Sequence, residues 1–474
     1  MATIEKGSMY LLVSRIIFFL TGYLLYLALG RFLLTPEQFG VFGVVIGLVS
    51  ITNVVLVRGI RQSVSKFVSA QREIAETVRA KAFQLQLGLS SIIFVAYVIA
   101  APFLAAMFND PSLTILIQIS AVSVFFQPLF NVLRGYINGL KKFKEEAVLS
   151  IIARTLRLVL PIALALAGFS LVGVFGGIAL AAALALAVAI LIAGFPRIKP
   201  GQVFASKTLL VFALPVIAFS FLQSLMMQLD VFFVKALVAE GAQAGYYVAA
   251  VTLGKLPFEV VLTITLVLFP LVSETTFSQM IEKAKFYVMH SFRYALMFIV
   301  PAALIASVTA PQLISLFYGA KYGVGAEALS ILLIAYIFFA LFSIASTIIV
   351  ASGHPKRMFL LGAAILLLDF ALNSYLVPLF GIKGAAISSL VAMALAALVS
   401  LGFVFHRFRV FPLRSALKIF IAAGVAMVPA ILFPLSGGML IVEYIVLMGV
   451  YAVLLFLLRE IKPVDINVVK NALF

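Results

Sequence analysis

The sequence contains no cysteine. Disulfide bonds, thiolate metal sites and cysteine nucleophiles are therefore excluded, and the redox compartment cannot be inferred from cysteine usage. Charge is also scarce, since only 11% of the 474 residues are Asp, Glu, Lys or Arg, whereas 64% are hydrophobic. With a mean hydropathy of +1.23, the chain carries more apolar surface than a soluble domain of this size can bury. These features predict an integral membrane protein.

Recognisable catalytic chemistry is missing as well. No GxxxxGK[ST] phosphate-binding loop occurs, and the stretch GVFGG at 173–177 lies inside an apolar run instead of between a strand and a helix. His290, His354 and His406 lie near the ends of apolar runs with no carboxylate cluster around them, so neither a metal site nor a catalytic base is indicated. We expect no enzymatic activity, no cofactor and no ATP hydrolysis. Any transport would be driven by an ion gradient, a substrate gradient or a partner.

What the sequence has instead is a series of apolar runs, each as long as the roughly 20 residues that a membrane-spanning helix needs. The first run is too long for a signal-peptide core and lacks an obvious cleavage site, so we interpret it as the first span. Several runs are longer than required, which indicates tilt or cytoplasmic extension of the helices. The fourteen predicted spans are 8–34, 38–62, 80–108, 113–139, 144–168, 171–195, 208–236, 242–273, 286–309, 325–351, 357–378, 383–406, 415–435 and 438–459.

The basic residues follow a topological pattern. The chain has 34 Lys and Arg against 17 Asp and Glu. If the N-terminus is cytoplasmic, most of the Lys and Arg fall in the termini and in the connections after even-numbered spans. The opposite side holds only Arg31, Lys235, Lys321 and Lys383. Because cytoplasmic loops carry such an excess, we expect a multi-pass protein of the plasma membrane with both termini in the cytoplasm. The net charge of +17 then reports topology, and no nucleic-acid partner is predicted.

A repeat appears when the first six spans are laid over the next six. The segment LLTPEQFGVF around Gly40 matches VAEGAQAGYY around Gly245, an offset of 205. SVFF ending at Phe126 matches YIFF ending at Phe339, and NGLKKF resembles SGHPKR, with offsets of 213 and 214. Because six spans are an even number, both copies share one orientation, related by a pseudo-two-fold axis along the membrane normal. We therefore predict lobes at 1–206 and 207–410, and helices 13 and 14 with a short cytoplasmic tail at 411–474.

Basic residues inside the spans are the first candidates for a site, because a charge buried in the bilayer costs at least roughly 2.5 kcal/mol and usually faces a cavity or a partner. Arg15 lies about two turns into the first span. Arg154 and Arg157 lie in mid-span 5, three residues apart and so on one helical face. Arg58, Arg61 and Arg134 lie near cytoplasmic ends, where snorkelling to the headgroups is the alternative to gripping phosphate. For the deeper arginines the alternative is pairing with carboxylates or carbonyls that hold helices together.

The remaining intramembrane charges suggest a second role. Lys255 and Glu259 are four residues apart in span 8 and flank Pro257, so they form either an ion pair or a substrate or coupling-ion site at a kinked helix. Asp230 in span 7 and Asp369 in span 11 could bind a proton or a cation, or neutralise an arginine across the bundle. We therefore take Glu259, Asp230 and Asp369 as coupling-ion candidates. Lys255 joins the arginines as a candidate phosphate ligand.

Several segments resemble the polysaccharide transporter family of the MOP superfamily, the Wzx-type oligosaccharide flippases. They are GRFLLTPEQFGVFGVV (30–45), GYINGLKKF (135–143), LFYGAKYGVGAEAL (316–329) and SGHPKR (352–357). The resemblance runs over essentially the whole chain. It implies an all-α polytopic MOP flippase fold of 14 transmembrane helices, with two six-helix lobes around a central cavity plus two C-terminal helices. It also implies that Arg15 and Lys255 contact the pyrophosphate of the lipid substrate.

The leading hypothesis is therefore a flippase that moves a lipid-linked oligosaccharide by alternating access. Its expected partners are that substrate, membrane lipids, H⁺ or Na⁺ as coupling ion, and enzymes of glycan assembly. A cation-coupled multidrug exporter and a lipid II flippase of the same superfamily remain alternatives. So do a non-transporting scaffold and a membrane glycosyltransferase or polymerase, although no long polar loop could host a sugar-nucleotide site.

Overall fold

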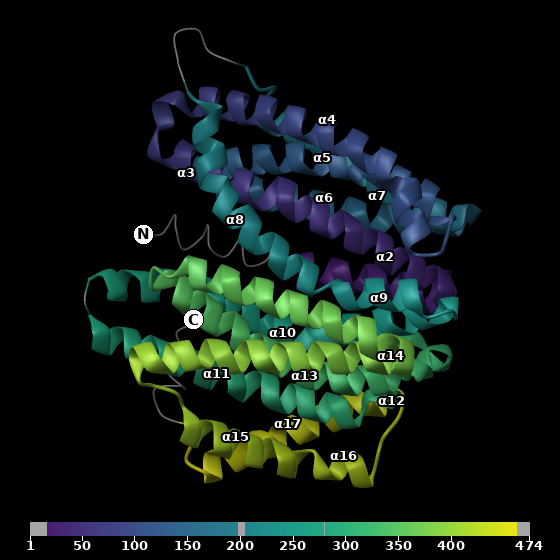
Figure 1. Cartoon of the computed structure of the whole chain (residues 1–474), viewed down its shortest axis with the longest axis vertical. Coiled ribbons are helices and arrows are strands. Elements are labelled where there is room, and N and C mark those ends of the chain that lie inside the picture. Colours follow the sequence, from purple (N-terminus) through teal and green to yellow (C-terminus); the bar gives the residue numbers. More distant parts are fainter. Residues whose placement is uncertain (1–16, 198–203, 279, 462–474) are drawn as a thin grey trace. The chain divides into compact units, whose positions relative to one another are not determined.

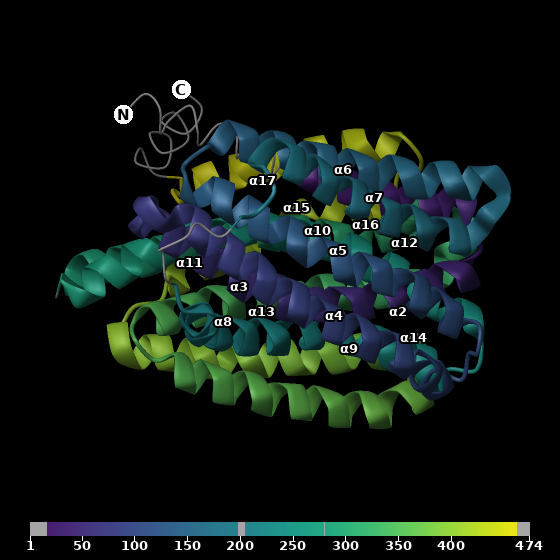
Figure 2. The same cartoon turned by 90° about the horizontal axis from the view of Figure 1, so that it is seen from above.

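The computed structural model describes residues 17–197, 204–278 and 280–461. Every regular element in these ranges is a helix, as Figures 1 and 2 show. Short π-helical or 3₁₀ turns, such as η2 (Val54–Arg58), connect some of them. The α-helices are α2 (Pro36–Asn53), α3 (Gly59–Ala70), α4 (Ala75–Met107), α5 (Leu113–Gly139), α6 (Phe143–Leu164), α7 (Ser170–Ala193), α8 (Ser206–Met226), α9 (Leu229–Leu237), α10 (Gly241–Phe277), α11 (Ile281–Val308), α12 (Ala310–Tyr318), α13 (Ala326–Ala351), α14 (Pro355–Phe408), α15 (Leu413–Ala426), α16 (Val428–Leu432) and α17 (Met439–Leu457).

Each predicted span coincides with helix in the described part of the chain. Among the described residues, nine stretches are long and apolar enough to cross a membrane, and Ser220–Met226 at the end of α8 together with α9, bent by 42° between them, is a tenth candidate. The 37-residue α10 covers predicted span 8, and a shorter apolar helix at Ile17–Leu33 lies within predicted span 1. The prediction of an all-α, multi-pass membrane protein is thus confirmed.

Two of the nine stretches contain two predicted spans joined at a glycine. Gly168, between α6 and α7, has φ of 94°, and Gly381, inside α14, has φ of 55°. Glycine adopts positive φ at little cost, which lets the chain reverse there. α6 packs against α7, and a side chain at Gly384 would collide with the Leu376 carbonyl, as a sharp fold requires. The two turn glycines are 213 positions apart, the offset that also relates Phe126 to Phe339, which supports the repeat.

The described chain divides into two compact units, Met1–Gly245 and Tyr246–Phe474. The first unit includes α8 and α9, which belong by sequence to the second repeat. An ion pair between Lys235 of α9 and Asp110 of the α4–α5 connection, at 2.7 Å, fastens α9 there. The division into 1–206, 207–410 and 411–474 follows the repeat instead of this packing, and it stays a prediction.

The TPEQFG segment begins α2. Thr35 caps the helix: its side chain accepts from the backbone N–H of Gln38, and the Gln38 side chain accepts from the Thr35 N–H. Pro36 occupies the first helical turn, where its missing N–H costs nothing. Gly40 ends the motif, and a Cβ there would lie 2.7 Å from the backbone nitrogen of Gly245. The glycines that match in the two repeats are therefore in contact, which explains why both lack a side chain.

A second pair of glycines brings α3 and α5 together. A Cβ at Gly135 would lie 2.8 Å from the carbonyl oxygen of Arg61, and a Cβ at Gly139 would lie 2.8 Å from that of Ser65 and 2.7 Å from Val68 Cβ. Small residues four apart allow this close backbone approach between membrane helices. The GYINGLKKF segment thus encodes a helix contact.

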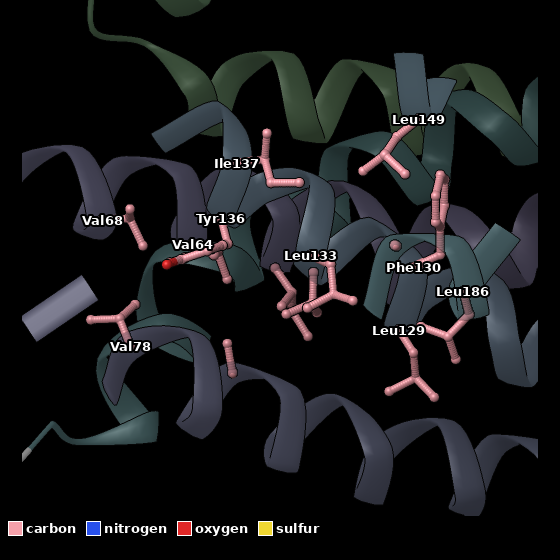
Figure 3. Packing of buried hydrophobic residues seen from close by; sticks show 14 of the residues in the cluster. Val64, Val68, Val78, Leu129, Phe130, Leu133, Tyr136, Ile137, Leu149 and Leu186 are labelled. Atoms are coloured by element: carbon pink, nitrogen blue, oxygen red, sulfur yellow. The ribbon is translucent and has the colours of Figure 1, made fainter. Parts of the chain in front are cut away.

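A hydrophobic core of the first unit includes residues of both helices (Figure 3). Residues from α3, α4, α5, α6 and α7 interlock there, and α4 runs along α5 (Figures 1 and 2). The labelled members are Val64, Val68, Val78, Leu129, Phe130, Leu133, Tyr136, Ile137, Leu149 and Leu186. This packing holds the cytoplasmic ends predicted for spans 2, 3 and 4 in one arrangement.

In the second unit, α15, α16 and α17 pack on α11. Arg293 Nε donates to Glu460 Oε1 at 2.7 Å, and both side chains are only 3% exposed. Lys418 Nζ donates to the carbonyl of Leu458 at 2.9 Å. Farther along, Tyr451 Oη donates to the Met297 carbonyl at 2.9 Å. Burial raises the pKa of Glu460, but hydrogen bonds from Arg293 and Ser415, together with the charges of Arg293 and Lys418, lower it overall.

We expect Gly139→Ala to destabilise the protein. The added Cβ collides with backbone and with β-branched Val68, so the contact has to open, at a cost of about 1–3 kcal/mol. Thermal denaturation of purified protein in detergent measures the effect. Gly88→Ala in α4 is the matched control, since nothing lies within 4 Å of a Cβ there. Equal melting temperatures for the two variants would contradict the proposed role of Gly139.

Glu460→Gln should lower the melting temperature at pH 7 and flatten its dependence on pH. A carboxylate whose folded pKa is depressed stabilises the protein above its unfolded pKa, about 4.3, and that stability is lost as the pH falls through the folded pKa. The melting temperature is measured between pH 3 and pH 7 in detergent. Glu282→Gln, at the exposed start of the same α11, removes a surface ion pair with Lys285 and should change little. If both variants kept the wild-type pH profile, the ion pair would not anchor these helices.

Candidate functional site

Four arginines of the first unit lie near one another on three helices. Arg61 is on α3, Arg134 on α5, and Arg154 and Arg157 on α6. The guanidinium group of Arg154 lies within electrostatic range of the other three. We call these four residues the arginine cluster. The sequence placed Arg154 and Arg157 on one helical face, and the fold adds Arg61 and Arg134 to them.

One carboxylate, Glu146, is bound into the cluster. It lies in the first turn of α6, and its side chain is only 2% exposed. Its Oε1 accepts from Arg61 Nη2 at 2.6 Å and from Arg134 Nη2 at 3.3 Å. Its Oε2 accepts from Asn138 Nδ2 at 2.5 Å. Both oxygens are therefore occupied by donors, as a buried carboxylate requires.

Arg154 and Arg157 have no such partner among the residues that the structure describes: no carboxylate there lies within 4.0 Å of either side chain. The Arg154 guanidinium lies 3.7 Å from the centre of the Phe18 ring, and Arg157 is in electrostatic range of the Tyr26 hydroxyl. A cation–π contact is worth about 0.5–2 kcal/mol, less than the several kcal/mol that desolvating a charge costs. With four arginines and one glutamate, the cluster carries an excess of three positive charges.

Polar residues of the GYINGLKKF segment form hydrogen bonds that hold the helices of the arginine cluster in place. Ser65 Oγ of α3 donates to Asn138 Oδ1 at 2.6 Å, so Asn138 links α3 to Glu146 of α6. The Tyr136 hydroxyl is hydrogen-bonded to Glu76, which also pairs with Arg79. Arg79 in turn donates to the backbone carbonyls of Ala193, the last residue of α7, and of Gly194. The end of α5 is thus tied to α3, α4, α6 and α7, which fixes where Arg134 and Glu146 stand.

The other predicted phosphate ligands fall elsewhere. Arg15 lies outside the described residues. Arg58 is exposed at the end of η2, although Arg61 one turn later joins the cluster. Lys255 is half-buried on α10, in the second unit. For Arg61, pairing with a carboxylate is what the structure shows, while the role of each of these residues in binding phosphate stays a prediction.

The three coupling candidates lie in different surroundings. Glu259 is half-buried one turn after Lys255, and α10 continues as helix through Pro257 between them. Asp230 is buried in the first turn of α9, where its Oδ1 accepts from the backbone N–H of Val231 at 2.8 Å. Asp369 is buried in α14, and Asn373 Nδ2 donates to its Oδ1 at 3.0 Å. Within the described ranges, no group of three His, Cys, Asp or Glu could hold a metal ion.

The sequence interpretation missed Glu146 and Asn138 as members of the site, and for Arg134 it left both snorkelling to the headgroups and gripping phosphate open. Glu146 stands in the segment KKFKEE, which reads as a solvated turn. One signal was available, since Glu146, Ser150, Arg154 and Arg157 recur at spacings of four, four and three along one face of α6. The proximity of Arg61 and Arg134 to that face is a tertiary contact without a local signal.

Solved structures with the same fold are transporters and flippases. Lipid II flippase MurJ, in an inward closed conformation, aligns with a TM-score of 0.77 at 16% identity and covers 96% of this chain and 99% of its own. An inward-facing multidrug resistance MATE family transporter of the MOP superfamily aligns at 0.64 and 16% identity, over 86% and 95%. A MOP superfamily transporter from Pyrococcus furiosus, whose binding pocket has reverse polarity, aligns at 0.58 and 18%, over 89% and 95%. At these identities the likeness establishes the MOP fold alone.

Sequence comparison establishes the family. No curated protein matches the chain. The family model described as polysaccharide biosynthesis protein matches residues 28–327, which is more than half of the chain and includes α2 to α12 as well as the whole arginine cluster. The chain therefore belongs to the polysaccharide biosynthesis protein family and has the fold of the MOP superfamily.

Proposed function

We propose that the protein is a flippase that moves a polyprenyl-(pyro)phosphate-linked oligosaccharide across the cytoplasmic membrane for the assembly of surface polysaccharide. The arginine cluster is the observation that carries this proposal. An excess of three positive charges on membrane-spanning helices calls for an anionic ligand, because unpaired charge in such a place is costly. The match to the polysaccharide biosynthesis family supports a lipid-linked sugar as this anionic ligand.

Arginine suits the phosphate groups of such a substrate. Its planar guanidinium donates two hydrogen bonds side by side and keeps its charge at any physiological pH. Arg154 and Arg157 stand about two turns and three turns beyond Glu146 on α6, so the cluster extends along the helix instead of ending at its tip. We propose that the phosphates bind along this face while the polyprenyl tail stays in the bilayer. Arg15 and Lys255 are further candidate ligands.

The proposed transport cycle is alternating access with both termini in the cytoplasm. The lobes would rock relative to each other, and prolines within helices, such as Pro128, Pro161 and Pro301, would permit local bending. Energy would come from a proton or cation gradient acting on Asp230, Glu259 or Asp369. Asp369 is the candidate that we test below; it is buried, and Asn373 Nδ2 donates to its Oδ1 at 3.0 Å.

Two alternatives of the same fold differ in the ligand. A multidrug exporter for organic cations would have to accommodate its cargo beside a cluster with an excess of positive charge, which like-charge repulsion opposes. A lipid II flippase would carry another pyrophosphate-linked lipid, and the cluster fits that anion equally well. A flipping assay that compares lipid II with a polyprenyl-pyrophosphate-linked oligosaccharide distinguishes a lipid II flippase from an oligosaccharide flippase.

Replacing Arg154 or Arg157, which have no carboxylate within 4.0 Å among the described residues, should slow transport strongly. In Arg154→Gln and Arg157→Gln, we expect flipping of a fluorescent polyprenyl-pyrophosphate-linked sugar in proteoliposomes to fall at least about tenfold, equivalent to 1.4 kcal/mol. Arg72→Gln, on an exposed arginine outside the cluster, is the control and should keep wild-type flipping. Unchanged flipping by both cluster variants, at normal protein levels, would falsify the proposal.

Replacing Asp369 should separate coupling from binding. We expect Asp369→Asn to remove the dependence of flipping on an imposed pH or Na⁺ gradient, since the amide cannot carry the charge change. Binding of inorganic pyrophosphate to the purified protein should persist. Glu240→Gln, at an exposed position just before α10, removes one negative charge in the same way and is the control, which should keep the wild-type dependence on the gradient. An Asp369→Asn protein that still responds to the gradient would rule out Asp369 as the coupling group.

A further inference from the structure

We propose that Glu146 is a displaceable counter-ion, which holds Arg61 and Arg134 in the empty protein and yields them to the phosphate oxygens of the bound substrate. This inference rests on the proposed function. A carboxylate and a phosphate present the same kind of acceptor to a guanidinium group, so the two compete for the same donors. Glu146 would then be a residue that limits how tightly the substrate binds.

The contacts of Glu146 are divided in a way that permits such an exchange. Only Oε1 meets the arginines, at 2.6 Å from Arg61 and 3.3 Å from Arg134, while Oε2 is held separately by Asn138. A rotation that releases Oε1 therefore leaves one hydrogen bond in place. The first turn of α6, where Glu146 stands, also favours a negative charge through the unsatisfied N–H groups of the helix end.

The arginines differ from Glu146 in access. The Arg61 side chain is 35% exposed and that of Arg134 is 14% exposed, whereas Glu146 is 2% exposed. The guanidinium groups are therefore more accessible to an incoming anion than the carboxylate is. Arg154 and Arg157, which have no carboxylate within 4.0 Å in the described part of the chain, extend the positive surface beyond this point.

The exchange of Glu146 for phosphate would act both in the empty protein and when the substrate is released. In the empty protein, Glu146 reduces the repulsion within a cluster that would otherwise carry four like charges. When the substrate has to leave, the carboxylate returns to Arg61 and Arg134 and competes with the phosphate. A protein without this carboxylate should bind anions more tightly and release them more slowly.

The experiment uses the full chain purified in detergent, with inorganic pyrophosphate as the probe. Isothermal titration calorimetry should show about tenfold tighter binding by Glu146→Gln than by the wild type, equivalent to 1.4 kcal/mol. Flipping of the fluorescent lipid-linked sugar at saturating substrate should fall several-fold. Glu145→Gln removes the same charge from the adjacent position, outside the ion pairs of the cluster, and should leave both properties near wild type.

Opposite changes in binding and flipping distinguish competition from a structural role, because a damaged site would lose both. Weaker or unchanged pyrophosphate binding by Glu146→Gln, beside a wild type that binds, would overturn this inference and leave the proposed function standing. A wild type that does not bind pyrophosphate would overturn both. If Glu146→Gln does not fold, Glu146→Asp carries the test: its shortened carboxylate reaches both arginines less well, so binding should tighten, and binding no tighter than wild type would overturn the inference.

Discussion

The cost of placing guanidinium groups on helices that cross a membrane organises the first unit. A charge buried on such a helix is costly unless it has a partner, a compensating ring or a ligand. Glu146 meets this need for Arg61 and Arg134, at 2.6 and 3.3 Å, and Phe18 meets part of it for Arg154. The charge that remains is positive, and all four arginines lie within residues 28–327, the range that the polysaccharide biosynthesis family model matches.

This arrangement depends on close helix packing. Glu146 can reach α3 only because Gly135 and Gly139 let the backbones of α3 and α5 approach, which also brings Ser65 to Asn138. The hydrophobic residues around that contact hold it closed (Figure 3). The polar network and the apolar core therefore depend on the same helix contact. The glycines set the distance between the backbones of α3 and α5, and that distance lets Arg61 and Arg134 reach Glu146.

Much of the fold could be predicted because its signals are local. Apolar runs of sufficient length predict spans, and each of the fourteen coincides with helix in the described part of the chain. The repeat was visible in short motifs, and Gly168 and Gly381 now add a matching pair of turns. Arg154 and Arg157 were found because a charge inside an apolar run stands out from its neighbours. Glu146 was not found, because a glutamate in a lysine-rich turn looks ordinary.

The sequence by itself determined that this is a multi-span helical protein, since hydropathy and span length act residue by residue along the chain. It also determined which charges lie inside the spans. Only the tertiary structure decided which of those charges meet. Whether an arginine faces a carboxylate, a ring or another arginine depends on the approach of helices that are distant in sequence, such as α3 and α6. That approach is set by packing at Gly135 and Gly139, where the absence of a side chain matters only in the presence of the opposing helix.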